Sequence, residues 1–435
     1  MKNYTAWMRP MRLSPVFLAA TLGSTACDLN LTNPNAPTEE EVLSSSDGLI
    51  ALSLGMQEQY ASSILTYVRA PALVTDEWGT QTRALAADQA LFTGGAIDPS
   101  FGVVSGPYFV TYRVIRSANN LLVGVPGSDL PPPAQAGIIA TAKLFKAMAL
   151  GMAIQQYERV PIDADIAGAM PQPRPVVLAE VIRLLESARV DLAPFTDANL
   201  AAFRARALTP QFDLRNTVDA MLARYYLISG QYQQANDAAA RVNLNSVSVF
   251  TFPTPTRNPV EAYAFGLLYV GGLESFVTEA EPGDQRPAFW LNTTASLITS
   301  TQGTPPVRLY PLRQYSGEND PYPVYLPGEM LLIRAEAQAR LNNLDQARTL
   351  INQVRTKAPT ATTPGANLPA LTAAQLPTQA AILRQVAYER RYELYMQGLR
   401  WEDLRRLGQF AGRQPKSAFL PLPESECQIN PSAGC

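Results

Sequence analysis

The sequence contains no histidine in 435 residues, and this absence excludes whole classes of chemistry. Mechanisms that pair a serine or cysteine nucleophile with a histidine base are excluded, and so are zinc and haem sites with histidine ligands. Its three cysteines, Cys27, Cys427 and Cys435, do not form the clusters that hold zinc or iron and sulfur. No segment has the spacing of a calcium loop. We therefore predict no metal site and no bound cofactor, and a calcium site of oxygen ligands is the alternative.

Signals for phosphate and nucleic-acid binding are also missing. Gly271 and Gly272 are not followed by the Lys-Ser or Lys-Thr pair of a phosphate loop. No run of lysine or arginine is long enough to follow a phosphate backbone, and residues 27–435 carry 32 basic and 37 acidic side chains. We expect neither nucleotide chemistry nor a nucleic-acid partner.

The apolar run near the N-terminus, from Leu13 to Leu22, is about ten residues long and too short to cross a bilayer. Three basic residues precede it, and Ser24 and Ala26 lead to Cys27. We predict that residues 1–26 are a lipoprotein signal peptide and that Cys27 is the lipid attachment site. More than one acyl chain would anchor the protein durably to a membrane. An ordinary secretory peptide is the alternative, because the usual leucine three places before the cysteine is missing.

Cys427 and Cys435 are separated by seven residues that include Pro431 and Gly434. In a secreted protein such a pair is typical of a local disulfide, which we predict here. A loop this small would hold the C-terminal tail in place more than it would stabilise the fold. Two free thiols on a frayed end are the alternative.

Apolar residues recur at helical spacing along most of the chain, which predicts a mainly α protein. Two segments, 223–235 and 335–347, share the small residues and tight turn of tetratricopeptide repeats. We therefore predict that residues 27–435 form a single domain of stacked helix pairs, with a helix over 379–397 covering the end of the stack. The predicted pairs are 48–66 with 107–123, 138–156 with 176–192, 216–229 with 231–242, and 328–341 with 344–357.

Two long segments, at about 72–107 and 243–327, do not fit the helical pattern. The second holds 11 of the 36 prolines between Pro253 and Pro327, which argues against long helices there. Loops of this length are usually functional or disordered, and the aromatic and aliphatic content of these two favours ordered, packed insertions. We expect both insertions to form one surface beside the helical scaffold.

The predicted helix near the C-terminus carries charges where apolar residues are expected. At helical spacing Glu389 and Arg390 fall on the inward side, and Glu393 lies one turn from Glu389. Two like charges one turn apart destabilise a helix unless a cation lies between them. Arg390, Arg400 and Arg405 are the cations that the local sequence offers.

The order of residues 389–408 is also specific to a family. Glu-Arg-Arg-x-Glu-Leu from Glu389, then Gly398, then Arg-Trp-x-Asp-Leu-Arg-Arg-x-Gly ending at Gly408 resembles the C-terminal signature of the SusD/RagB family of nutrient-binding outer-membrane lipoproteins. Segments 332–337, 341–347 and 351–355 resemble the family's last helical repeat, 33–38 its start, and 419–423 its final segment. Gln397 and Leu399 depart from it, since the family usually has an acidic residue and a histidine there.

The resemblance implies a surface-exposed, lipid-anchored outer-membrane protein that is not an enzyme. It would bind a nutrient, with an oligosaccharide as the first expectation and a peptide as another, and deliver it to a SusC-like TonB-dependent transporter. A tetratricopeptide-type adaptor that binds only proteins is one alternative, and a glycosidase that uses two carboxylates is another. The acids in the insertions available for such catalysis are Asp76, Glu77, Glu279, Glu281 and Asp284. Helix capping, pairing with Arg286 or exposure to water is the simpler interpretation of these acids.

Sugar binding without catalysis needs flat apolar faces and planar hydrogen-bonding side chains. Trp78 and Trp290 lie one in each insertion, where the resemblance implies ligand contacts. The other candidates near them in sequence are Tyr263, Tyr269, Arg286, Phe289 and Asn292. Core packing is the alternative for each aromatic side chain.

Overall fold

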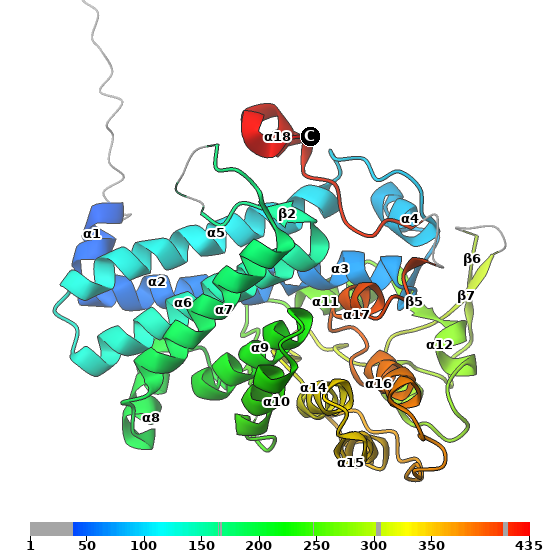
Figure 1. The fold of residues 1–435 in the computed structure, drawn as a ribbon. Helices are drawn as coiled ribbons and strands as arrows, with labels where there is room; N and C mark the ends of the chain where they lie inside the picture. Colours follow the sequence, from blue (N-terminus) through cyan, green and yellow to red (C-terminus); the bar gives the residue numbers. More distant parts are fainter. Residues whose placement is uncertain (1–37, 164, 166–167, 247, 302–305, 412–415) are drawn as a thin grey trace, which may run out of the picture. The chain divides into compact units, whose positions relative to one another are not determined.

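The chain is mainly helical, and its long helices lie where apolar residues recur at helical spacing (Figure 1). The computed structural model describes residues 38–435 apart from 164, 166–167, 247, 302–305 and 412–415. The predicted signal peptide and Cys27 lie outside the described residues, as do residues 33–37. Residues 40–435 form one structural unit.

All four predicted helix pairs are formed. Neighbouring pairs also touch, through α5 with α6, α7 with α9, and α10 with α14, so the stack is continuous. The helix α16 (Gln379–Glu393) packs on both helices of the last pair, at the end where we expected a cap. The mainly α prediction is confirmed, and the stacked arrangement is compatible with tetratricopeptide-like repeats. The pairs are α2 (Ser46–Ser62) with α5 (Gly102–Gly124), α6 (Pro132–Gln156) with α7 (Arg174–Leu192), α9 (Leu214–Ile228) with α10 (Tyr232–Arg241), and α14 (Pro327–Arg340) with α15 (Leu344–Arg355).

Several helix boundaries differ from the prediction: α5 and α6 begin earlier, at Gly102 and Pro132, and two other predicted helices end earlier. The helix expected over 48–66 is interrupted at Ser63, and the chain continues as α3 (Ile64–Val74). The helix expected over 379–397 ends at Glu393, because Met396 and Gly398 adopt positive φ angles of 63° and 72°. A left-handed residue cannot continue a right-handed helix.

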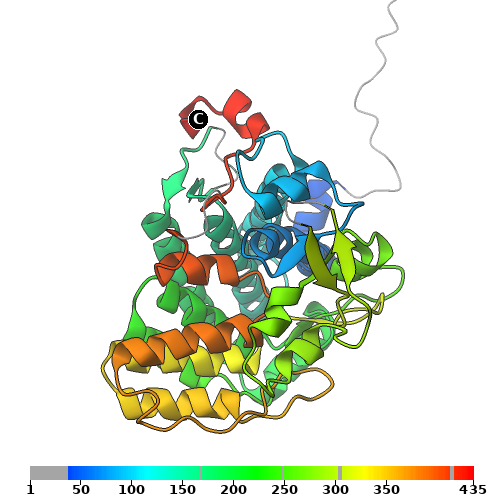
Figure 2. The ribbon, with the colours of Figure 1, turned by 90° about the vertical axis from the view of Figure 1, so that its right-hand side faces the viewer.

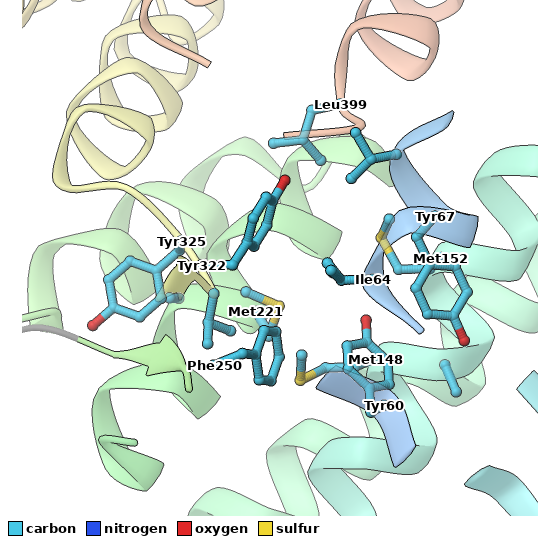
Figure 3. Close-up of a cluster of buried hydrophobic side chains, with 14 of the residues drawn as sticks. Tyr60, Ile64, Tyr67, Met148, Met152, Met221, Phe250, Tyr322, Tyr325 and Leu399 are labelled. Carbon is cyan, nitrogen blue, oxygen red and sulfur yellow. The ribbon is translucent and has the colours of Figure 1, made fainter. Parts of the chain in front are cut away.

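The central helix α6 is the only described helix long and apolar enough to cross a membrane, and 83% of its most apolar window is buried in the structure. It therefore serves as the core helix of this unit. Tyr225 of α9 packs so closely on it that a Cβ at Gly151 would lie 2.2 Å from the tyrosine ring. Figure 3 shows the adjoining core, in which Tyr60 of α2 lies near Met148 of α6 and Phe250.

The two insertions meet in one antiparallel sheet of four strands, in the order β1-β5-β7-β6. The first insertion supplies β1 (Trp78–Thr80), and the second supplies β5 (Val270–Leu273), β6 (Ile298–Ser300) and β7 (Val307–Tyr310). Figure 2 shows this sheet beside the helices. A Cβ at Gly271 would lie 2.9 Å from the carbonyl of Tyr310, so this glycine permits close strand packing. The expected joining of the insertions is confirmed by the pairing of β1 with β5.

Short elements complete the described chain. Two further two-stranded ladders pair β2 with β3 and β4 with β8. The remaining elements are α1 (Glu39–Ser44), α4 (Ala86–Thr93), η1 (Val125–Gly127), β2 (Arg159–Val160), β3 (Gln172–Pro173), α8 (Asp197–Ala207), β4 (Val249–Phe250), α11 (Pro259–Glu261), the π-helical turn η2 (Ala262–Gly266), α12 (Glu274–Thr278), α13 (Arg286–Trp290), β8 (Tyr322–Pro323), α17 (Arg400–Arg406), α18 (Glu424–Ile429) and η4 (Pro431–Ala433).

The inward-facing glutamates of α16 pair with cations, as expected. The cations are not the arginines of residues 390–405 that the local sequence offered. Glu389 and Glu393 are both buried, and Arg286 lies against them at 2.6 Å and 4.0 Å. Lys357 also pairs with Glu393 at 2.7 Å, and Arg355 with Glu389 at 3.4 Å. The cations thus come from the second insertion and from the end of α15.

The arginines proposed for that role have other partners. Arg390 is buried as predicted and donates to Asp403 of α17 at 2.7 Å, while Arg405 pairs with Glu402 at 2.7 Å. Arg400 donates to the carbonyl of Ala387 at 3.4 Å. The prediction that these three arginines separate the two glutamates is therefore wrong, because Arg390 and Arg400 join α16 to α17 and Arg405 pairs within α17.

Candidate ligand-binding surface

Both predicted tryptophans are buried among other side chains. The indole N–H of Trp290 donates to the carbonyl of Tyr392 at 2.8 Å, and its ring lies near those of Phe289 and Tyr395. Trp78 lies in β1 and stacks on Tyr263, with 6.2 Å between the ring centres. Trp290 thus joins the second insertion to the helical scaffold, and Trp78 joins the two insertions, which is the core-packing alternative.

Three more of the predicted ligand residues are buried as well. Arg286 is held by Asp284 at 2.7 Å and by the glutamates of α16. The Tyr263 hydroxyl donates to Asp88, and Phe289 packs edge-on against Trp290. Burial, with the nearby Asp88 carboxylate, raises the pKa of Tyr263. The structure thus packs five of the predicted ligand residues inside the protein, and ligand contact through them stays a prediction; they are Trp78, Tyr263, Arg286, Phe289 and Trp290.

Tyr269 and Asn292 are the two predicted ligand residues that reach the surface. Tyr269 is half-buried, its ring packs edge-on against Tyr263, and its carbonyl accepts a hydrogen bond from the Gln81 N–H at 2.8 Å. Asn292 is exposed, and its side chain accepts a hydrogen bond from the Thr294 hydroxyl at 2.9 Å. Tyr269 is thus fixed at the point where the two insertions pair.

Three exposed leucines flank that point, and sequence reasoning missed them. Leu85, Leu267 and Leu268 are 45%, 48% and 45% exposed. Leu268 precedes Tyr269, and Leu85 follows Gln81 by four residues. We call these five residues the insertion edge. No sequence signal marks the leucines as exposed, because a Leu-Leu pair ordinarily belongs to a core.

The backbone at the insertion edge is unusual. Leu268 has a φ angle of 55°, in the left-handed region that bulky residues avoid. The π-helical turn η2 (Ala262–Gly266) lies directly before the two leucines. Strained residues and π-helical turns are both concentrated at functional sites. The exposed apolar side chains and the strained backbone together make the insertion edge the candidate site.

The acids considered for catalysis have structural partners. Ion pairs join Asp76 to Lys416, Glu279 to Arg391, Glu281 to Arg355 and Asp284 to Arg286. Glu77 is buried. Among the residues that the structure describes, no group of three or more acids, cysteines or histidines is placed to hold a metal ion. These partners support the simpler interpretation of the acids.

The C-terminal tail is closed on itself. Cys427, in α18, forms a disulfide with Cys435, and their sulfur atoms are 2.10 Å apart. The side-chain amide of Asn430 donates to the carbonyl of Ala169 at 2.9 Å, which joins the tail to the segment after β2. The tail is therefore an ordered part of the surface.

Comparison with known proteins identifies the fold and a match to one family model. Residues 312–430 match the model of the SusD family. Many solved structures share the fold over nine-tenths of the chain. A search of curated protein sequences finds no match.

Three of these structures illustrate the likeness. A SusD-like carbohydrate binding protein from Bacteroides vulgatus has a TM-score of 0.70 at 15% identity, covering 89% of this chain and 97% of its own. NanU of B. fragilis has a TM-score of 0.68 at 14% identity, covering 92% and 98%. A SusD superfamily protein from Bacteroides thetaiotaomicron has a TM-score of 0.68 at 16% identity, covering 91% and 99%. The C-terminal part of this chain thus matches the SusD family model, the chain shares the fold of SusD superfamily structures over most of its length, and the resemblance to the SusD/RagB family is confirmed.

Proposed function

We propose that this protein is a cell-surface lipoprotein of the outer membrane that binds an oligosaccharide and delivers it to a SusC-like TonB-dependent transporter. The match of residues 312–430 to the SusD family model supports this proposal, and so does the carbohydrate-binding protein of the same fold. The helix stack provides a rigid frame. The insertions supply the ligand surface, and the protein binds its ligand without converting it.

The proposal depends mainly on the exposed apolar surface of the insertion edge. A pyranose ring presents a C–H face that packs on flat apolar side chains, and Tyr269 with Leu267 and Leu268 offers such a surface. Exposed apolar patches on soluble proteins commonly mark binding sites. The paired or buried acids of the insertions leave binding as the chemistry that this surface supports best.

Replacing Tyr269 by alanine is expected to weaken oligosaccharide binding about tenfold, because a stacked aromatic ring contributes roughly 1.5 kcal/mol. A glycan array on the wild type selects the ligand, and calorimetry then compares the variants. Tyr232→Ala on α10, where the tyrosine is also half-buried, is the matched control and should bind normally. If no glycan binds to the wild type, the protein-binding adaptor becomes the better interpretation.

Replacing Leu268 by asparagine is expected to weaken glycan binding and to stabilise the fold. Asparagine tolerates the positive φ angle that leucine avoids, so the free energy of unfolding should rise by about 0.5–1 kcal/mol. Urea unfolding and calorimetry on the same preparation measure both effects. Val190→Asn, at an exposed position on α7, is the control for loss of an exposed apolar side chain. Unchanged glycan affinity in Leu268→Asn would remove this leucine from the site.

Replacing Cys27 by serine is expected to release the protein from the membrane fraction, because lipid chains attached to that cysteine would be the anchor. Fractionation of expressing cells and the intact mass of the purified protein test this. The double variant Cys427→Ser, Cys435→Ser removes the other two cysteines and should remain in the membrane fraction. Membrane-bound Cys27→Ser would contradict the anchor.

A further inference from the structure

A pocket lies between α5, the C-terminal helix α18 and the segment after β2, and its lining shares no residue with the insertion edge. It has a volume of about 150 Å³, and its polar lining comes from Tyr108, Tyr112, Asp163, Glu426 and Asn430. In both Figure 1 and Figure 2, α18 lies at the top, apart from the strands β6 and β7. No role in the proposed function has been assigned to these residues.

The walls of this pocket, which we call the tail pocket, are held in place. The rings of Tyr108 and Tyr112 lie 4.7 Å apart on neighbouring turns of α5. Asp163 accepts hydrogen bonds from Asn119 at 3.3 Å and from the N–H of Asp165 at 3.0 Å. These contacts hold the side chains of this wall in position in the absence of a ligand.

The tail side of the pocket is equally well fixed. The Asn430 amide donates to Glu426 at 2.7 Å as well as to the carbonyl of Ala169, and the disulfide closes the tail around them. Arg159 donates to the carbonyl of Gly434 near the chain end. Three residues of the tail, Glu426, Ile429 and Asn430, thus form one wall.

One buried polar group faces this pocket without a partner. Tyr108 is only 4% exposed, and its hydroxyl has no hydrogen-bond partner among the described residues. Its polar neighbours are the Tyr112 hydroxyl and the Glu426 carboxylate, both in the lining, and its contacts with them do not reach hydrogen-bond geometry. A buried hydroxyl without a hydrogen-bond partner is unfavourable. A ligand that hydrogen-bonds to it would recover that free energy.

The lining determines what kind of ligand fits. It offers two carboxylates, an amide and two phenols but no lysine or arginine, so it disfavours anions and suits a ligand rich in hydroxyl donors. Pro161, Ile429 and the tyrosine rings supply apolar surface. The volume is below the range usual for drug-sized ligands, roughly 300–1,000 Å³, and suits one small molecule. We propose that the tail pocket binds a single monosaccharide unit, as a second carbohydrate site.

Saturation-transfer NMR with glucose, galactose and mannose tests this on the full chain. At least one sugar should bind with a millimolar dissociation constant. Tyr108→Phe should weaken that binding about fivefold to tenfold, the effect of one lost hydrogen bond, and Glu426→Gln should weaken it by about tenfold or more. Glu424→Gln, on the same helix but outside the pocket, is the matched control and should bind like the wild type.

Several outcomes would overturn the proposal. One is that ethanolamine binds and the sugars do not. Another is that no sugar binds and a crystal structure shows only an ordered water on Tyr108. A third is that Tyr108→Phe binds sugar as tightly as the wild type. The tail pocket shares no lining residue with the insertion edge, so the two sites can be tested separately. Tyr269→Ala should leave monosaccharide binding at the tail pocket intact, whereas Cys427→Ser, Cys435→Ser should weaken it. Failure at one site is therefore distinguishable from failure at the other.

Discussion

Replacing Arg286 by methionine is expected to lower the free energy of unfolding by about 3–5 kcal/mol. The Arg286 guanidinium is buried and lies 2.7 Å from Asp284 and 2.6 Å from Glu389, with Glu393 at 4.0 Å. Methionine has a similar volume but no charge, so the carboxylates would remain buried with fewer cations. Removing one partner of a buried ion pair is strongly destabilising for this reason. Urea unfolding followed by circular dichroism measures the loss.

Arg391→Met provides the matched control. Arg391 also pairs with a glutamate, Glu279, at 2.6 Å, but the two side chains are 25% and 56% exposed. Exposed ion pairs contribute up to about 1 kcal/mol, so this variant should remain close to the wild type. If Arg286→Met has the same free energy of unfolding as Arg391→Met and loses only glycan affinity, Arg286 belongs to the ligand site. That result would contradict its structural role.

The contrast between Arg286 and the helices shows what the sequence can predict. Helix formation depends on residues three and four apart, so the helix pairs and the inward position of Glu389 followed from spacing alone. The partner of Glu389 lies 103 residues away, in an insertion with no regular period. Local reasoning therefore offered Arg390, Arg400 and Arg405, which are near in sequence but have other partners in the structure.

The insertions show the same limit for the candidate site. That they join was predictable from their composition and length, and β1 pairs with β5. Which of their side chains reach the surface was not predictable, because no helical or strand period distinguishes inside from outside. Trp78 and Trp290 are buried, whereas Leu267 and Leu268 are exposed. Sugar chemistry alone would have favoured the tryptophans over the leucines as ligand residues. The unusual feature of Leu268 is its positive φ angle, and a φ angle cannot be predicted from a leucine in the sequence.

Glu77 is a buried carboxyl group next to Trp78, at the start of the first strand of the insertion sheet. Its Oε2 atom has no hydrogen-bond partner among the described residues. Burial raises its pKa from 4.5 to about 8, while Arg400, Arg391 and a hydrogen bond from the Met396 backbone act in the opposite direction and Asp403 adds to the rise. In the folded protein at neutral pH this side chain is therefore mostly protonated.

The unfolded chain loses that proton near pH 4.5, whereas the folded protein loses it near pH 8. Folding therefore retains a proton between these values, and the free energy of unfolding falls as the pH rises through this window. The fall is at most about 5 kcal/mol, since each pKa unit corresponds to about 1.36 kcal/mol. Above pH 8 both states are ionised, and the contribution becomes constant.

Replacing Glu77 by glutamine should remove this pH dependence, because the amide is neutral at every pH. Below pH 4 the variant and the wild type should unfold with similar free energies, since the wild-type carboxyl is then protonated in both states. At pH 9 the variant should be more stable by about 3–5 kcal/mol. Urea unfolding at pH 4, 7 and 9 measures the difference, with Glu58→Gln at an exposed position on α2 as the control. A difference between Glu77→Gln and the wild type that stays constant from pH 4 to pH 9 would mean that Glu77 is ionised in the folded protein, with Arg400 and Arg391 outweighing its burial.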